Sequence, residues 1–371
     1  MLTTDHIHQI ALMQVTGVGS VVAKNLISYC GSAQEVFNTP SNKLLKIPDI
    51  GKVTAQNIAE NAKTALQIAE REANYLEKNQ EFRAISYYDD EYPKRLKNCF
   101  DAPLVLFCNK DIDFETLHVI GIVGTRSSTD YGKQLCEELC AELVPYNPLI
   151  ISGLAYGIDI CAHKNALKYG LPTAAVVAHG IDKIYPSAHS GIAKKMGETG
   201  GGIITEFLTQ TRPDRENFPQ RNRILAGLCD ALVVVEAAPK GGALITANLA
   251  VEYNREVFAY PGRVKDEFSE GCNNLIKNNK ANIITTGSDI AWHLNWDLET
   301  KKSKNVKQNV LFADLQPDEQ CIFDVLGSEA MHIDEICQKT GFSSSKASST
   351  LLIMEFAGVI KAMPGKLFEK N

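Results

Sequence analysis

The sequence lacks an excess of positive charge, and it has no cysteines paired at the spacing of a metal site. It contains 38 Lys and Arg against 44 Asp and Glu, which gives a formal net charge of −6 at pH 7. A nucleic-acid site would therefore have to be a local basic patch on an acidic protein. The ten cysteines include no CxxC pair, and Cys136 and Cys140 have no histidine near them in the sequence. We interpret both as buried thiols in a reducing compartment, and we expect no metal.

The chain also has no apolar run of 18 residues and no signal-peptide pattern at its N-terminus. These two absences predict a soluble, cytoplasmic protein without a membrane partner. What the sequence does have is length and apolar content, with 371 residues of which 44% are hydrophobic. That length suggests two or three domains, and the apolar content is sufficient for a real core.

The most informative stretch runs over residues 218–246. A basic lead-in at 221–223 precedes a short apolar helix and then an apolar strand at 231–236, whose lack of alternation is typical of a parallel strand covered on both faces. The strand ends in Pro239-Lys240-Gly241-Gly242, where a second helix begins. Such a turn is where α/β sheets bind phosphate, because the first N–H groups of the helix have no internal partner and the helix dipole adds partial positive charge.

Two more turns of this kind lie upstream. One follows a predicted strand at 118–124, where Thr125-Arg126-Ser127-Ser128 opens a helix and where Ser127 and Asp130 fit a capping box. The other is the loop 152–159, which follows a further strand. All three loops leave the carboxyl ends of strands, so in one parallel sheet they share an edge. We expect that edge to carry Arg126, with Arg221 and Arg223 beside it.

Strands and helical segments alternate from residue 117 to 294, which predicts an α/β fold with a doubly wound, mostly parallel sheet. The stretch 209–220 resists this pattern because of its polar residues and prolines, and we interpret it as a surface loop. Short strands are expected at 82–86 and 104–108. The strands expected in the main sheet are 118–124, 149–153, 172–179, 202–207, 230–237, 256–261 and 282–286.

The N-terminal region, 1–80, is predicted to be all helical. Two segments, 12–26 and 45–58, each place an apolar helix end, a glycine turn and a new helix in the same order, which is the helix-hairpin-helix pattern. Turns of this kind either offer N–H groups to a DNA phosphate or are plain helix caps within a bundle. Both interpretations stay open.

The C-terminal part is predicted to be a small domain behind a polar, lysine-rich tether at 299–310. Three helices and a two-stranded hairpin fit residues 311–371, which is the pattern of a winged helix. The third helix, 343–356, has only Lys346 as a cation, so we expect it to contact protein rather than to read a DNA groove. The predicted domains are therefore 1–80, 81–298 and 311–371, with the linker 299–310 between the last two.

Six motifs that occur in order between about residues 115 and 285 resemble those of the DprA/Smf family of bacterial DNA-processing proteins. One such motif alone is weak, but six in order are specific, and the helical front and the winged-helix tail also match the longer members. The motifs are Gly124-Thr125-Arg126; Ser152-Gly153-Leu154-Ala155 with Gly157-Ile158-Asp159 and His163; Gly180-Ile181-Asp182 with Tyr185-Pro186; Phe218-Pro219 with Arg221-Asn222-Arg223; Gly242-Ala243-Leu244-Ile245-Thr246; and Pro261-Gly262 with Gly271-Cys272-Asn273.

The resemblance implies an extended Rossmann-like core behind a SAM-like helix-hairpin-helix domain. It implies a protein, not an enzyme, that binds single-stranded DNA, protects incoming DNA and loads the RecA recombinase in natural transformation of competent bacteria. It also implies that no dinucleotide or other cofactor is bound and that the chain forms a homodimer through the Rossmann-like domain. Single-strand-binding protein is a further possible partner.

The resemblance also implies roles for particular residues. Arg126 would clamp a phosphate, Arg221 and Arg223 would add positive charge, and Phe218 is a candidate for stacking on a base, as is Tyr156. The residues expected to bind single-stranded DNA are Gly124, Thr125, Arg126, Ser127, Ser152, Gly153, Tyr156, Lys183, Phe218, Arg221, Asn222, Arg223, Gly241, Gly242 and Thr246.

Two other functions stay open. A nucleotide-cleaving hydrolase on a related core would need a catalytic carboxylate at the loop edge, and Asp159 and Glu236 are the only candidates there. We expect Asp159 to cap a helix, and Glu206 or Glu236 to pair with an arginine. A scaffold that gathers proteins without contacting DNA at the sheet edge is the third possibility.

Two further observations argue against chemistry at this edge. The first turn does not fit G-x-G-x-x-G and no acidic residue ends the second strand, which disfavours a dinucleotide enzyme. His163 and His179 are expected to satisfy local hydrogen bonds. No set of nucleophile, base and orienting group is evident.

Overall fold

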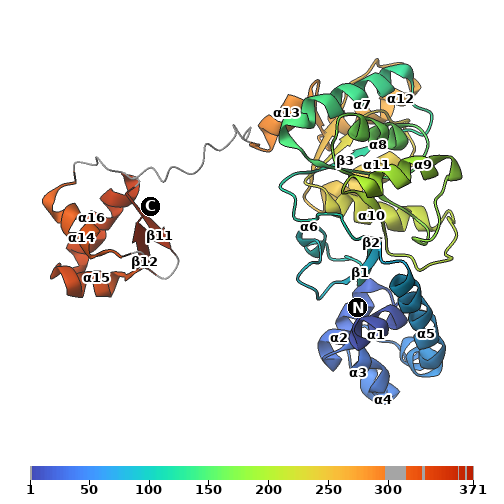
Figure 1. The fold of residues 1–371 in the computed structure, drawn as a ribbon, viewed down its shortest axis with the longest axis horizontal. Coiled ribbons are helices and arrows are strands. Elements are labelled where there is room, and N and C mark those ends of the chain that lie inside the picture. The colour runs from blue at the N-terminus through green and yellow to red at the C-terminus, as the bar shows by residue number, and fades with distance from the viewer. Residues whose placement is uncertain (1, 297–314, 328–330, 358, 364–365, 371) are drawn as a thin grey trace. The chain divides into compact units, whose positions relative to one another are not determined.

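The structure, a computed structural model, describes residues 2–296, 315–327, 331–357, 359–363 and 366–370. These residues fall into two compact units, one within 1–298 and the other within 299–371. Figure 1 shows the helices and the large sheet of the first unit and the small sheet and helices of the second. The predicted linker at 299–310 lies outside the described residues.

The first unit opens with helices, as predicted for the N-terminal region. Two hairpins are built on the same plan and hold each other, because the Asn25 side chain donates to the Pro48 carbonyl (2.9 Å) and the Asn57 side chain donates to the Thr16 carbonyl (2.9 Å). The predicted helix-hairpin-helix repeat is therefore present as a closed pair. The helices are α1 (Thr4–Leu12), α2 (Ser20–Cys30), α3 (Ala33–Asn38), α4 (Ser41–Leu44) and α5 (Lys52–Lys78).

A nine-stranded sheet follows, with strand order β1-β2-β6-β5-β4-β3-β7-β8-β9. The two short entry strands, β1 and β2, join its edge in antiparallel fashion. The other seven strands, β3 to β9, are parallel to one another. The chain moves outward from β3 to β6 and then returns to β7 on the other side of β3, so β3 and β7 are neighbours at the point where the winding reverses. The strands are β1 (Phe82–Ser86), β2 (Val105–Asn109), β3 (Val119–Val123), β4 (Leu149–Ser152), β5 (Thr173–Val176), β6 (Gly202–Thr205), β7 (Ala231–Val234), β8 (Glu256–Ala259) and β9 (Asn282–Ile283).

Helices cover both faces of this sheet, which confirms the doubly wound prediction (Figure 1). Buried side chains of α6, α10, α11 and α12 pack on one face, and those of α7, α8 and α13 pack on the other. The N-terminal helices and α9 share a third hydrophobic cluster with β2, β5 and β6. The helices are α6 (Lys94–Lys97), α7 (Asp130–Leu143), α8 (Ile158–Lys168), α9 (Ser190–Glu198), α10 (Asn217–Leu228), α11 (Gly242–Glu252), α12 (Glu267–Lys277) and α13 (Gly287–His293), with short 3-10 turns at Val144–Tyr146 and Ser187–His189.

One segment differs from the prediction. The sequence predicts a surface loop over 217–220 and a polar lead-in over 221–223, but α10 starts at Asn217 and contains all of them. Pro219 does not prevent this, because it lies in the first helical turn, where a backbone N–H has no partner within the helix. The basic residues are therefore carried within the helix rather than on a lead-in that precedes it.

The second unit is a winged helix, as predicted. Its core joins Ile322, Ile336, Leu351 and Met354. The three helices are α14 (Pro317–Val325), α15 (Ile333–Thr340) and α16 (Ser344–Phe356), and β10 (Met331–His332) adds a third strand to the hairpin of β11 (Ile360–Met363) and β12 (Leu367–Lys370).

The described residues hold no helix that is both long enough and apolar enough to cross a membrane. All ten cysteines are free, and Cys136 and Cys140 are fully buried, as predicted. Within the described ranges, no group of three or more His, Cys, Asp or Glu side chains is arranged to hold a metal ion.

Candidate nucleic-acid interface

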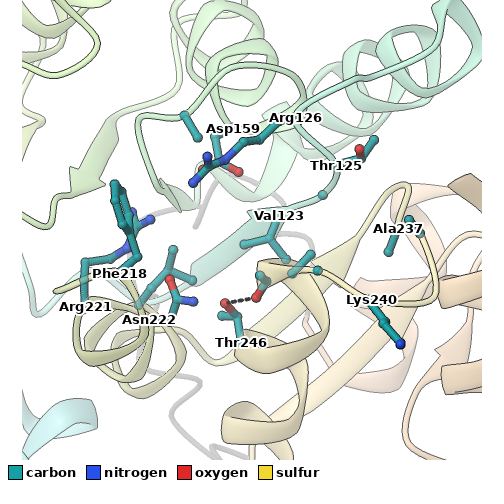
Figure 2. A pocket seen from close by; sticks show the side chains of 17 residues that line it. Val123, Thr125, Arg126, Asp159, Phe218, Arg221, Asn222, Ala237, Lys240 and Thr246 are labelled. Carbon is teal, nitrogen blue, oxygen red and sulfur yellow. Dashed lines mark hydrogen bonds between the residues drawn. The ribbon is translucent and has the colours of Figure 1, made fainter. Parts of the chain in front are cut away.

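A cavity of about 330 Å³ lies at the carboxyl ends of β3 and β7, where the winding of the sheet reverses. Open α/β sheets bind their ligands at this point. We call this cavity the anion pocket (Figure 2). Its walls come from the exit loops of β3, β4 and β7 and from α8, α10 and α11. The lining residues include Gly124, Thr125, Arg126, Asp159, Phe218, Arg221, Asn222, Lys240, Gly241, Gly242 and Thr246.

Two arginines converge on this pocket with few partners of their own. Arg126 is exposed, forms no ion pair or hydrogen bond with the described residues, and places its guanidinium 5.4 Å from the centre of the Phe218 ring. Arg221 is only 7% exposed; one of its terminal nitrogens donates to the Val176 carbonyl, and its buried Nε has no partner. Its guanidinium lies 5.9 Å from the same ring. The two cations around Phe218 thus leave donors free for an anion.

The first turn of α11 adds backbone donors to the same wall. Gly241 is the N-cap residue and provides no side-chain cap, so the first N–H groups of the helix have no partner from a capping side chain. Gly241 and Gly242 are exposed, and a Cβ atom at either would meet nothing within 4 Å. The Thr246 hydroxyl donates to the carbonyl of Gly242, four residues earlier in α11, at 3.1 Å (Figure 2). An anion in the pocket would face both the guanidinium groups and this helix terminus.

Asp159 is the one carboxylate among the described residues that line the pocket. It does not cap α8 as predicted, because Gly157 occupies the N-cap position and Asp159 lies one residue inside the helix. Burial raises the pKa of the Asp159 carboxyl, while the charges of Arg221 and Arg126 and the Ala155 N–H oppose this rise. The pocket therefore holds two arginines, Lys240 and one carboxylate that is costly to keep ionised, and a phosphate would complete its charge balance.

A smaller cavity of about 50 Å³ adjoins the anion pocket and shares Arg126, Arg221 and Phe218 with it. We call it the aromatic pocket. Its rim carries Tyr156 and Tyr185, which are 53% and 51% exposed. Exposed rings beside cations are the combination that binds single strands, because unpaired bases stack on rings while the cations hold the phosphates.

Three loops meet where Arg126 is held. A Cβ atom on Gly157, which has a φ of +82°, would lie 2.1 Å from the Thr125 carbonyl oxygen, so only glycine permits this approach. The capping box of Ser127 and Asp130 is wrong, because α7 is capped by Thr129, whose hydroxyl accepts from the Gly132 N–H. Thr129 takes this place because its own N–H and hydroxyl donate to the Glu236 carboxylate.

Arg223 does not reach the anion pocket. Residues two apart on a helix do not face the same side, so once 217–228 is helical, Arg221 and Arg223 diverge. The Arg223 guanidinium instead pairs with Glu206, one of the pairings expected from the sequence, and donates to the Asp101 carbonyl. Arg223 therefore positions α10 against the segment that precedes β2.

Replacing Arg223 with alanine is expected to lower the free energy of unfolding by about 3 kcal/mol, the scale for removing one partner of a buried ion pair. The loss is large because Glu206, whose pKa burial already raises, would stay buried without its cationic partner. DNA affinity at low temperature should keep its salt dependence. Urea unfolding and a salt titration of binding check both points, and a reduced salt slope would place Arg223 at the interface instead.

Four more of the expected residues lie outside the two pockets, namely Ser127, Ser152, Gly153 and Lys183. Ser152 and Gly153 are buried, and the Ser152 hydroxyl donates to the Ile122 carbonyl. Lys183 donates to the Gln210 carbonyl at 3.1 Å and lines a different cavity. Both ring nitrogens of His163 and of His179 have local partners, as expected, and burial lowers the pKa of His163 to about 4.

Lys240 lines the anion pocket but was not among the expected site residues. It is exposed and forms no ion pair or hydrogen bond with the described residues. Its place in the glycine turn after β7 was a sufficient signal, because a cation in such a turn lies beside the free N–H groups of the next helix.

Comparison with known proteins agrees with this architecture. Residues 83–295 match the family described as DNA recombination-mediator protein A, residues 312–366 match the DprA winged helix domain, and residues 10–64 match a SAM-like helix-hairpin-helix tandem. Protein Smf from Synechocystis sp. is 30% identical over 100% of both chains, and protein Smf from Escherichia coli is 34% identical over 74% of each.

Two solved structures are similar as well. The X-ray structure of DNA processing protein A from Streptococcus pneumoniae has a TM-score of 0.64 and 29% identity, and the match covers 78% of this chain and 98% of that one. DNA processing protein A from Helicobacter pylori, whose structure concerns its single-stranded DNA binding mode, has a TM-score of 0.52 and 28% identity over 58% of this chain and 96% of that one. The architecture, the ordered motifs and these relatives together place the chain in the DprA/Smf family of DNA-processing proteins.

Proposed function

We propose that this protein binds single-stranded DNA along the anion and aromatic pockets. The observation that carries the proposal is the convergence of Arg126 and Arg221 on Phe218, with guanidinium donors that the described residues leave unused. A phosphate would take the guanidinium groups and the N-terminus of α11, and the adjoining base would stack on an exposed ring. The single-stranded DNA binding mode of the Helicobacter pylori relative supports the same substrate class.

A preference for single strands follows from the aromatic pocket, because the base pairs of a duplex keep their faces stacked on each other and away from protein rings. Fluorescence anisotropy with one labelled oligonucleotide, alone and annealed to its complement, tests this. The single strand should bind more tightly across the salt range. Equal affinity for both forms would refute a role for the aromatic pocket.

We further propose that the bound strand is handed to the RecA recombinase, so that the protein acts as a recombination mediator that protects incoming DNA in natural transformation. The family description, DNA recombination-mediator protein A, supports the mediator role. A homodimer through the Rossmann-like unit and contact with single-strand-binding protein belong to the same proposal. Strand exchange by RecA on DNA coated with single-strand-binding protein should speed up when this protein is added, and no change would refute the mediator role.

The winged helix is not expected to contribute to DNA affinity. Its third helix, α16, has Lys346 as its one cation, and that ammonium is paired with Asp318 at 2.8 Å, while Leu352, Ile353 and Phe356 are exposed. This supports a protein-contact role. Removing residues 311–371 should leave single-strand affinity within about threefold, a change of roughly 0.6 kcal/mol. Anisotropy with the truncated chain checks this, and a much larger loss would place the DNA site in the C-terminal unit.

A nucleotide-cleaving hydrolase is the second candidate because Asp159 lines the anion pocket and has a raised pKa, as catalytic acids often do. The other carboxylate considered, Glu236, is occupied by Thr129 and does not line the pocket. Incubation with the nucleoside monophosphates, followed by chromatography, separates the two functions. The binding proposal expects no cleavage, and release of free base that is lost in Asp159→Asn would favour the hydrolase.

A further inference from the structure

Glu236 lies two residues beyond the end of β7, is 5% exposed, and contacts both ends of the loop that carries Arg126. Its backbone carbonyl accepts from the Thr125 N–H at 2.8 Å. Its carboxylate accepts from the Thr129 N–H at 3.0 Å and from the Thr129 hydroxyl. Arg126 lies between these two attachment points and has no ion pair or hydrogen bond of its own with the described residues.

The space for this carboxylate is provided by a missing side chain. A Cβ atom on Gly132, in the first turn of α7, would lie 2.1 Å from Glu236 Oε2 and 2.2 Å from its carboxyl carbon. The same Gly132 donates its N–H to the Thr129 hydroxyl at 3.1 Å. The first turn of α7 and the loop after β7 are thus in contact through the carboxylate of Glu236. Glu236 does not line the anion pocket; it lines a separate cavity together with Thr129 and Tyr131.

We propose that Glu236 is a positioning residue for DNA binding, and the proposal rests on the proposed function. It holds the loop 124–129 at both ends, so that Arg126 is presented over Phe218 before DNA arrives. It also joins the two walls of the anion pocket, because the chain continues from Glu236 into the glycine turn that begins α11. A loop that is already ordered loses less conformational entropy when the strand binds.

Two substitutions remove this contact in different ways. Glu236→Ala deletes the carboxylate, and Gly132→Ala places a methyl group where the carboxylate lies. Both should weaken single-strand binding by about fivefold, since the loop has to be ordered during binding. Gly132→Ala is informative because alanine favours helix more than glycine does, so lower affinity would not reflect a weaker helix. Gly191→Ala, in α9 with nothing within 4 Å of its Cβ position, is the matched control and should bind as the wild type does.

Glu236→Gln tests the hydrogen bonds apart from the charge. Its amide oxygen accepts from the Thr129 N–H and its amide group donates to the Thr129 hydroxyl, so affinity should stay within about threefold of the wild type. If the carboxylate acted only by repelling phosphate, both Glu236→Gln and Glu236→Ala would bind more tightly than the wild type. Tighter binding by both would overturn the proposal.

A double-mutant cycle with Arg126→Ala decides whether Glu236 acts through that arginine. Glu236→Ala should cost about fivefold in the wild-type background and less than about twofold once Arg126 is gone. Equal losses in both backgrounds would overturn the positioning role and leave the DNA site intact. If Arg126→Ala alone binds as the wild type does, it is the proposed DNA site that fails.

Discussion

Replacing Arg126 with alanine should weaken the binding of single-stranded DNA by at least about tenfold, and replacing Arg221 as well should bring the loss to about a hundredfold, since each charge-assisted contact is worth about 1.5–3 kcal/mol. Arg126 has no ion pair or hydrogen bond with the described residues, so its guanidinium donors are available to a phosphate. Arg221 already bears the cost of burial, with its Nε unpaired. An anion that reaches this nitrogen recovers an interaction that the folded protein lacks.

Salt titrations separate these losses from general changes in charge. Each phosphate contact removed should reduce the slope of log affinity against log salt by about 0.7 for a single strand. Lys110→Ala is the matched control, because it removes one exposed positive charge at the end of β2, outside both pockets. Arg221→Lys provides a second variant if the alanine protein does not fold, since it keeps the charge and loses the Nε donor. An unchanged affinity and slope for Arg126→Ala would contradict the assignment.

Replacing Asp159 with asparagine should have the opposite effect and tighten single-strand binding at neutral pH by about tenfold. The carboxylate lies in the pocket proposed for phosphate, and like charges about 6 Å apart repel by about 2–3 kcal/mol at an effective dielectric constant of 20. Asparagine keeps an oxygen that can accept from the Ala155 N–H, so the start of α8 should be retained. Anisotropy at one salt concentration measures the change, and weaker binding would contradict it.

The same carboxylate makes the affinity depend on pH. Burial raises the pKa of Asp159 in the free protein, and a bound phosphate would raise it further. Binding then takes up a proton, so affinity should rise as the pH falls through the range just above the ordinary carboxyl value, and should be flat at higher pH. His179 also lines the aromatic pocket, and burial lowers its pKa. Because His179 is present in the wild type and in Asp159→Asn alike, it does not account for a difference between their pH profiles. The asparagine variant should lose most of the dependence, and an unchanged pH profile would show that Asp159 does not face the bound strand.

The position of the anion pocket could be predicted from the sequence because it depends on strand order and on short loops. Apolar runs without alternation indicated parallel strands, and glycine turns after three of them put Gly124, the loop 152–159 and Gly241 at one edge. The structure places residues of all three loops around the anion pocket. The position of the anion pocket follows from apolar strands and glycine turns, and each of these can be recognised from a few neighbouring residues.

The errors arose where a distant contact determines a local choice. Ser127 fits a capping box by spacing, but Thr129 caps α7 because Glu236, more than a hundred residues away, accepts both of its hydrogens. Asp159 fits an N-cap by its position after a glycine turn. The N-cap residue is instead Gly157, whose positive φ brings it against the backbone of Thr125 and Arg126. No pattern within a few residues carries this information.

Arg223 shows how an error in secondary structure becomes an error in the site. The sequence predicts a polar lead-in that carries Arg221 and Arg223 together to the sheet edge. In a helix they diverge, and Arg223 meets Glu206 instead. The two prolines of 209–220 favour a loop in the sequence, but proline is tolerated in the first turn of a helix, where Pro219 lies.

A crystal structure of the protein with a short oligothymidylate tests the central claim most directly. The account predicts a phosphate in the anion pocket, within hydrogen-bond distance of the Arg126 guanidinium, of Arg221 Nε and of the first N–H groups of α11. It also predicts a base against the ring of Phe218, Tyr156 or Tyr185. A strand bound to the helix-hairpin-helix region or to the winged helix, with the pocket between β3 and β7 holding no part of it, would contradict the account.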